Sequence, residues 1–395
     1  MRRDLYNSDH ELYRDTVRNF FQRDVVPHYE DWERGRIIDR GVYPLAARHG
    51  IFGLEIPEAY GGSGVADYRY RMIVCEESAR VFTTSFNVTL GLFDDVVLRY
   101  LLELTTEEQK QRWLPGLASG ERICAMAMTE PAAGSDLRGI RTTARRDGDA
   151  WILNGSKTFI SCGTCADMVI VAARTGSGRS DFSLLVVEEG MEGFVRGRKL
   201  DKVGLHSQDT AELFFENVRV PAGNVIGDVG SGLSHMMFNL PRERLSVAAQ
   251  SYTSARSIYE VTRSYASTRF AFGKPLVDQQ HIRFVLAEIA TELDVAEAYL
   301  DRSVSALDAA SLTPVDAAKG KWYASELYKR TVDRCVQIFG GYGYMVESPV
   351  ARAFIDSRAS TIYAGTTEIM KEIIGRDLPD REVDGGEAAV ASERA

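Results

Sequence analysis

The hydrophobic pattern of this chain changes its period twice, and this change constrains the fold more than any other feature. Up to about Gly120, apolar residues recur at the spacing of helices. Over residues 123–227 they gather in short β-branched or aromatic runs between turn residues, with no long helical pattern between the runs. Over residues 231–375 the helical spacing returns, and one apolar stripe runs from Ile282 to Leu307.

This order predicts an α+β, mainly helical protein built from three units. We expect an N-terminal helical domain over 1–122, a central antiparallel β-sandwich or barrel over 123–228 and a C-terminal four-helix bundle over 229–378. Residues 379–395 are polar and without pattern, which predicts a disordered tail. Because no GxGxxG follows a strand, a Rossmann dinucleotide site is disfavoured.

Composition excludes several classes of function. The net charge is −9 and no basic cluster appears, so we expect no nucleic-acid partner. No run of about 18 apolar residues occurs, so no membrane span is expected. The first residues combine acids with no apolar run, which argues against a secretory or transit peptide. Five cysteines are too few for a disulfide framework, so the predicted compartment is a reducing cytoplasm.

Familiar catalytic motifs are missing from the sequence. Cys162 and Cys165 form a C-x-x-C pair, but the pair lies between two strand runs and we interpret it as chance. The six histidines show no H-x-x-x-H spacing, so no metal site is predicted. No GxSxG elbow indicates a serine hydrolase.

Four segments combine glycines with polar or aromatic side chains. MAMTEPAAGSD (126–136) offers turn amides and hydroxyls, and RFAFGKP (269–275) offers an Arg for phosphate and a Phe for a flat ring. QIFGGYGY (337–344) permits close backbone approach, and IYAGTTEIM (362–370) contains a helix-start signal. Taken alone, each also fits an ordinary strand-end turn, helix end or helix cap.

A fifth segment, NLPRERL, carries three adjacent charges. We expect it to open a long helix at Asn239, which places Glu243 in or near the first turn. Taken alone, Glu243 could be a surface acid that complements the helix dipole, with Arg244 as its solvated neighbour.

Together and in this order, these segments resemble the signature blocks of the acyl-CoA dehydrogenase family, from about Leu5 to Leu378. The blocks are MAMTEPAAGSD, KTFISCG, KVGLHSQDTAELFFENVRVP, RFAFGKP, QIFGGYGY and IYAGTTEIM. The resemblance implies the three-domain fold above, bound FAD, a homotetramer and an acyl-CoA substrate. It also implies an electron-transferring flavoprotein as the electron acceptor.

The resemblance also implies positions for the ligands. FAD contacts expected from the β-domain are Met126, Met128, Thr129, Gly134, Ser135, Phe159, Ile160 and Ser161. Contacts expected to cross a subunit boundary are Arg269, Phe272, Gln280, Gln337, Gly340 and Gly341. Thr366 and Glu368 match further cofactor positions. The substrate positions are Ser135, Arg244, Ala364 and Gly365.

One departure from the family pattern assigns the base. Many members carry the catalytic Glu directly before the GT of the IYxGT block, where this chain has Ala364. The isovaleryl and long-chain branches place the base on the helix after the β-domain, in a motif similar to LPRERL. Glu243 falls on that base and Arg244 on its neighbour. Phe159 and Cys162 replace a more usual Trp and Asn.

The implied reaction is α,β-dehydrogenation of an acyl-CoA to the trans-2-enoyl-CoA. An α C–H is a weak acid, so its removal needs a positioned base and donors aimed at the thioester oxygen. Burial would make Glu243 a stronger base. Alternatives on the same fold are an oxidase, a flavin-dependent monooxygenase, a dehydrogenase of carrier-protein-bound acyl groups and a flavin-bound scaffold without catalysis.

Overall fold

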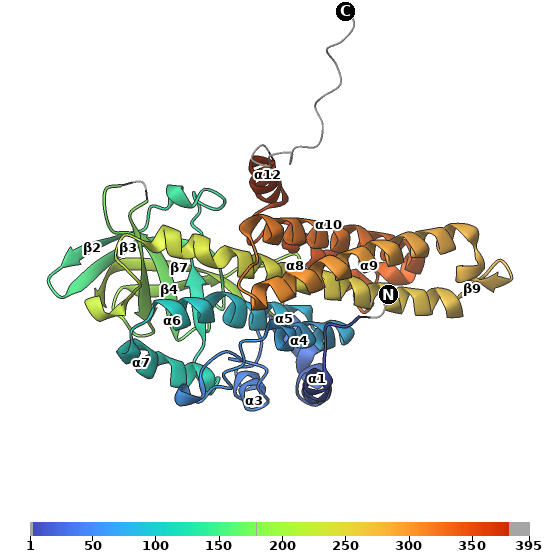
Figure 1. Cartoon of the computed structure of the whole chain (residues 1–395), viewed down its shortest axis with the longest axis horizontal. Helices are drawn as coiled ribbons and strands as arrows, with labels where there is room; N and C mark the ends of the chain where they lie inside the picture. Colours follow the sequence, from blue (N-terminus) through green and yellow to red (C-terminus); the bar gives the residue numbers. More distant parts are fainter. Residues whose placement is uncertain (1–2, 179, 379–395) are drawn as a thin grey trace, which may run out of the picture.

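The computed structural model describes residues 3–178 and 180–378, and the expected tail over 379–395 lies outside them (Figure 1). The sheet lies at one end of an elongated molecule and long helices extend to the other end, with the N-terminal helices packed along one side. The predicted class, mainly helical with a central sheet domain, is confirmed. Within the described ranges, no helix is long and apolar enough to span a membrane.

The N-terminal unit is a set of short helices. They are α1 (Ser8–Phe20), η1 (Phe21–Val25), α2 (Val26–Gly35), α3 (Val42–Arg48), η2 (Glu58–Tyr60), α4 (Tyr68–Arg80), α5 (Thr84–Gly91), η3 (Leu92–Val97), α6 (Leu98–Leu104) and α7 (Glu107–Ala118). The segment η3 is a π-helix that joins α5 to α6 without a break. Such π segments occur frequently at functional sites, and this one carries the buried Asp94 and Asp95.

The central unit is one eight-stranded sheet. Its strands are β1 (Cys124–Ala127), β2 (Thr143–Asp147), β3 (Ala150–Ser161), β4 (Met168–Arg174), β5 (Phe182–Glu188), β6 (Phe194–Lys199), β7 (Thr210–Pro221) and β8 (Val225–Ile226). The order is β6-β7-β3-β2-β4-β5-β8, and β1 pairs with β4. Pairing is mainly antiparallel, as predicted, but β1 and β2 both lie parallel to β4.

The C-terminal unit is the predicted helical bundle. It contains α8 (Gly232–Thr268), α9 (Gln280–Asp308), α10 (Pro314–Phe339), η7 (Gly340–Tyr344), α11 (Pro349–Ser360) and α12 (Thr367–Asp377). Between α8 and α9, the strands β9 (Phe270–Ala271) and β10 (Lys274–Pro275) form a hairpin that projects from the far end of the bundle, followed by η6 (Leu276–Asp278) (Figure 1).

The expected start of α8 at Asn239 is wrong. The helix begins at Gly232 and continues through Pro241, so Glu243 lies about three turns inside it. Proline is typical of the first helical turn, which is why NLPRERL resembled a helix start. Pro241 has no N–H to donate to the carbonyl of Met237, four residues earlier, yet the helix continues through it.

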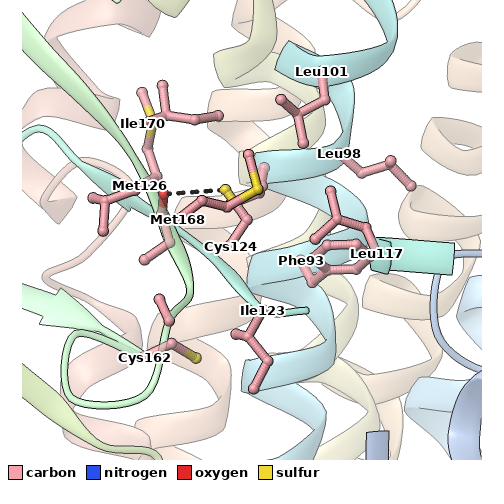
Figure 2. Close-up of a cluster of buried hydrophobic side chains, with 14 of the residues drawn as sticks. Phe93, Leu98, Leu101, Leu117, Ile123, Cys124, Met126, Cys162, Met168 and Ile170 are labelled. Carbon is pink, nitrogen blue, oxygen red and sulfur yellow. Dashed lines mark hydrogen bonds between the residues drawn. The ribbon is translucent and has the colours of Figure 1, made fainter. Parts of the chain in front are cut away.

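One hydrophobic cluster joins the N-terminal helices to the sheet. Figure 2 shows Phe93 and Leu98 on the helical side of this cluster and Met168 and Ile170 on the strand side. A second cluster fills the bundle and includes Tyr68 from α4. The N-terminal helices therefore contact both other units, and α6 packs against the part of α8 that carries Glu243.

Candidate active site

Two of the predicted segments meet near the end of β3. The N–H of Thr158 on β3 donates to the carbonyl of Thr129, which follows β1, across 3.0 Å. This contact brings Met126, Met128 and Thr129 beside the end of β3, where Phe159, Ile160 and Ser161 lie. Thr129 and Thr158 are 29 residues apart in the sequence, and contacts between β1 and β3 bring them together.

A buried ion pair fixes the segment that contains Thr129. Lys157 Nζ donates to the Met128 carbonyl across 2.9 Å and to Glu130 Oε1 across 2.8 Å. Glu130 also accepts the backbone N–H groups of Arg141 and Thr142. Burial lowers the pKa of Lys157 to about 8, although Glu130 opposes that shift. The buried ammonium group of Lys157 thus holds the turn after β1 in place.

Phe159 combines backbone strain with an exposed ring. Its φ is 60°, in the left-handed region, and its side chain is 68% exposed. The register between β3 and β7 shifts between Lys157 and Ile160, and this irregularity turns Phe159 out of the sheet. A strained aromatic residue with an uncovered face is typical of a ligand contact.

The loop after Glu130 lies on the surface. Gly134 and Ser135 are both exposed, and a side chain added at Gly134 would meet no atom. Both residues are therefore open to solvent.

Glu243 projects from α8 into the protein interior, where its side chain is 7% exposed. The Tyr100 hydroxyl on α6 donates to Glu243 Oε1 across 3.1 Å. Burial raises the pKa of Glu243 to about 7, while the Tyr100 hydrogen bond and the charge of Arg244 act in the opposite direction. A carboxylate in this state exchanges protons near neutral pH, as a general base must.

Contacts on both sides of Glu243 hold α8 against the N-terminal unit. Ser246 Oγ donates to Asp95 Oδ2 across 2.5 Å, and Arg242 lies 3.7 Å from Asp95 Oδ1. Arg242 also pairs with Glu55. Because Asp95 belongs to η3, directly before α6, these contacts fix Glu243 relative to Tyr100.

Arg244 is a buried cation whose Nε has no hydrogen-bond partner among the described residues. Burial lowers its pKa, and the charge of Glu243 opposes that effect. The charge of Arg244 in turn helps burial to lower the pKa of Lys321 on α10 to about 8. Two buried cations thus lie near Glu243, and an unsatisfied donor of this kind suits an incoming oxygen.

Lys321 connects this region to the segment before α12. Its Nζ donates to the Gly365 carbonyl across 2.6 Å. Ala364 and Gly365 both have positive φ, 54° and 95°, so the backbone turns sharply there. The Ala364 turn is therefore held next to the residues around Glu243, although Ala364 itself has no ionisable group.

The other two predicted residues of this segment, Thr366 and Glu368, lie at the start of α12. Thr366 is the N-cap of α12 and accepts the Ile369 N–H across 3.3 Å. Glu368 is exposed, and hydrogen bonds from its own backbone N–H and from Thr366 lower its pKa. A solvated carboxylate of this kind is a weaker base than Glu243.

The residues expected to cross a subunit boundary lie at the other end of the bundle. The six are all exposed: Arg269, Phe272, Gln280, Gln337, Gly340 and Gly341. Phe339 stacks on Tyr265 with ring centroids 4.1 Å apart, which joins the end of α10 to the end of α8. Figure 1 shows the hairpin β9–β10 and the sheet at opposite ends of the molecule. One chain therefore does not bring the two groups of residues together.

Three residues of the site were not predicted from the sequence. Tyr100 lies 143 residues before Glu243, and Lys157 and Lys321 resemble ordinary surface lysines in the sequence. Lys157 is the first residue of the KTFISCG block, and this position was the one sequence signal that could have pointed to it.

Comparisons with known families cover all three units. The family model described as acyl-CoA dehydrogenase, N-terminal domain, matches residues 7–121. The models for the middle and C-terminal domains match residues 125–218 and 230–378.

Individual relatives are similar over nearly their whole length. The mitochondrial long-chain specific acyl-CoA dehydrogenase of Sus scrofa is 42% identical over 380 residues, which covers 95% of this chain and 88% of the relative. A crystal structure of an acyl-CoA dehydrogenase from Geobacillus kaustophilus has a TM-score of 0.92 and 43% identity, and covers 94% of this chain and 98% of that one. A glutaryl-CoA dehydrogenase from Mycobacterium smegmatis, solved in complex with FADH2, has a TM-score of 0.88 and 28% identity over 98% of this chain and 97% of that one.

Proposed function

Because this chain belongs to the acyl-CoA dehydrogenase family, a family of FAD-dependent oxidoreductases, we propose that it dehydrogenates an acyl-CoA thioester between Cα and Cβ, with Glu243 as the base. The product would be the trans-2-enoyl-CoA. The single observation that carries this proposal is a buried carboxylate with a pKa of about 7 on the helix that follows the sheet.

Glu243 would take the proton from Cα of the acyl group. Its raised pKa makes the carboxylate a better proton acceptor than a solvated Glu, and its burial keeps water from competing. Tyr100 would hold the ionised carboxylate in place through its hydroxyl. No covalent enzyme intermediate is required, so no nucleophile is needed.

Charge develops on the thioester oxygen as the proton leaves, and fixed donors would stabilise it. The turn at Ala364 and Gly365 offers backbone N–H groups, and Lys321 holds that turn through the Gly365 carbonyl. Arg244 adds a buried positive charge beside the base. We assign these residues to positioning and electrostatic stabilisation, and Glu243 alone to proton transfer.

The residues expected to bind FAD fit a large, partly flat and partly charged ligand. Phe159 presents an uncovered ring, and Thr129 lies beside it on a turn fixed by Lys157. At the far end, Arg269 offers an exposed guanidinium for phosphate, and Gly340 leaves open space next to the backbone. When bound, FAD supplies the hydride acceptor for Cβ.

We further infer a homo-oligomer, with a tetramer as the expected state. The two groups of FAD residues lie at opposite ends of one chain, so a neighbouring subunit must supply the second group. An electron-transferring flavoprotein would accept the electrons. All five cysteines are free thiols, which fits a reducing compartment such as the cytoplasm.

The experiment that tests this function is anaerobic mixing of the flavin-loaded protein with a panel of acyl-CoA thioesters. We expect bleaching of the flavin absorbance and formation of the enoyl-CoA, followed by turnover with an artificial electron acceptor. Bleaching that requires NADPH, or rapid reoxidation by oxygen with peroxide release, would favour the monooxygenase or the oxidase. If the protein binds FAD but no acyl thioester bleaches the flavin, the result would favour a flavin-bound scaffold without catalysis.

A further inference from the structure

The turn between β3 and β4 carries two thiols that the proposed reaction does not use. Cys162 is buried and Cys165 is half-buried. Their Sγ atoms and a carboxylate oxygen of Asp209 all lie within 4.8 Å of one another. Figure 2 shows Cys162 on this turn, beside Ile123 at the edge of the hydrophobic cluster. The structure thus places the C-x-x-C pair and an acid in one small cluster.

The backbone of the turn sets the two cysteines at the spacing of a disulfide. The Cys162 carbonyl accepts the N–H of Cys165 across 3.1 Å and the N–H of Ala166 across 2.8 Å. Residues in the first and fourth positions of such a turn have Cα atoms less than about 7 Å apart, and disulfides join Cα atoms up to about 6.8 Å apart. The two sulfurs lie within 4.8 Å of each other, and a disulfide would draw them to about 2 Å.

Cys162 occupies a strained backbone position. Its φ is 58°, in the left-handed region, where a residue other than Gly or Asn costs roughly 1–2 kcal/mol. Asn or Gly would fit this turn at lower cost, so the backbone alone does not explain a Cys at this position.

Asp209 holds the turn and faces the accessible thiol. Its Oδ2 accepts the Thr164 N–H across 2.8 Å and the Thr164 hydroxyl across 2.5 Å. Its Oδ1 accepts the Cys165 thiol across 3.6 Å. The hydrogen bond with Cys165 and burial both raise the pKa of Cys162. Cys165 is half-buried and Cys162 is buried, so Cys165 is the more accessible of the two thiols.

We propose that Cys162 and Cys165 form a thiol–disulfide exchange site that takes a low-molecular-weight disulfide such as oxidised glutathione. The Cys165 sulfur attacks one sulfur of the small disulfide, and its proton passes through Asp209 to the thiolate that leaves. The Cys162 sulfur then attacks Cys165 Sγ, and its proton goes to the second departing thiolate. Two protein thiols are oxidised to one disulfide, and one small disulfide is reduced to two thiols.

The site adjoins the residues proposed to contact FAD. Cys162 directly follows Phe159, Ile160 and Ser161 on β3. A disulfide that tightens this turn changes the environment of the bound flavin, which gives an optical readout. This readout rests on the proposed function, whereas formation of the disulfide does not.

The test uses the reduced, flavin-loaded full chain, incubated with oxidised glutathione under native conditions. After acid quenching, denaturation and alkylation, we expect the intact protein to have lost two hydrogen atoms, with the disulfide inside the tryptic peptide 158–174. The other three cysteines, Cys75, Cys124 and Cys335, should carry the label. Dithiothreitol should reverse the change, and the visible flavin spectrum should shift in parallel.

Two variants complete the test. Cys165→Ser keeps a hydroxyl for Asp209 and should form no disulfide, whereas Cys75→Ser, which removes a thiol elsewhere in the core, should behave like the wild type. Five free thiols after incubation, or a stable glutathione adduct on Cys165, would overturn the proposal. Stoichiometric binding of zinc alone that protects both thiols from oxidation would overturn it in favour of a metal site. A disulfide with an unchanged flavin spectrum would contradict the placement of Phe159 and leave the exchange site standing.

Discussion

The Tyr100 hydroxyl donates a hydrogen bond to Oε1 of Glu243 across 3.1 Å, and both side chains are buried. The two residues come from different units, α6 and α8, which Asp95 ties together through Ser246. Burial raises the pKa of Glu243 to about 7, and the Tyr100 hydrogen bond limits that rise by favouring the ionised form. Tyr100 is therefore a positioning residue that keeps the proposed base active near neutral pH.

The change Tyr100→Phe should move the pH dependence of the reaction. Glu243 must be ionised to accept a proton, so kcat/KM should rise with pH through about 7 in the wild type. Without the Tyr100 hydroxyl the carboxylate loses a donor, and the apparent pKa should rise by about 1. Activity should fall below neutral pH and recover in alkaline buffer. A uniform loss at every pH would show that Tyr100 affects only the fold.

The change Glu243→Gln should stabilise the fold in a pH-dependent way. The pKa of Glu243 is raised in the folded protein from 4.5 to about 7, so the carboxyl contributes a stability that is lost as pH rises between these values. Gln carries no such penalty, and its advantage in unfolding free energy should reach at most about 3 kcal/mol near pH 8. Thermal unfolding near pH 5 is the control, where the two proteins should differ little. Equal differences at both pH values would contradict the raised pKa.

The sequence predicts more of the fold than of the candidate site. The spacing of apolar residues predicts the order of helices and strands, because periods of 3.6 and two residues are visible within a short stretch of sequence. The partner of Glu243 could not be found in this way, because Tyr100 lies 143 residues away and no spacing rule connects the two. The predicted start of α8 was wrong because of Pro241. A proline inside a long helix looks the same in the sequence as a proline in the first turn.

Lys157 should control how tightly FAD is held. In Lys157→Met the Met128 carbonyl loses its donor and the buried Glu130 loses its only counter-charge among the described residues, which should cost roughly 3–5 kcal/mol of stability. The double change Lys157→Met with Glu130→Gln should recover part of that stability. Both proteins should bind FAD about tenfold more weakly, because the Thr129 turn is loosened in each.

Fluorescence titration of flavin-free protein measures this affinity, and unfolding curves measure the stability. Lys329→Met, at an exposed lysine paired with Glu326, is the matched control. Wild-type FAD affinity in the double variant would show that Lys157 does not position the cofactor segment.

Mixed oligomers should reveal whether each site is shared between subunits. Glu243→Gln removes the proposed base, and Arg269→Ala removes a proposed phosphate contact at the opposite end of the chain. If one subunit supplies Glu243 and its neighbour supplies Arg269, random co-assembly of the two variants should restore roughly one quarter of the wild-type sites. Co-expression with two different tags and double affinity purification gives the mixed species. Sites built within one chain would give no recovery.

The central claim, that Glu243 is the base, is tested most directly by anaerobic stopped-flow measurement of flavin bleaching by an acyl-CoA. Glu243→Gln should keep FAD and bind substrate but bleach at least about 10²–10⁴ times more slowly than the wild type. Glu368→Gln should bleach at nearly the wild-type rate, because Glu368 is exposed and its pKa is lowered. Adding Ala364→Glu to Glu243→Gln should restore part of the rate, because Lys321 holds the Ala364 turn beside the same site. Wild-type bleaching by Glu243→Gln, or loss of bleaching in Glu368→Gln with FAD still bound, would contradict the account.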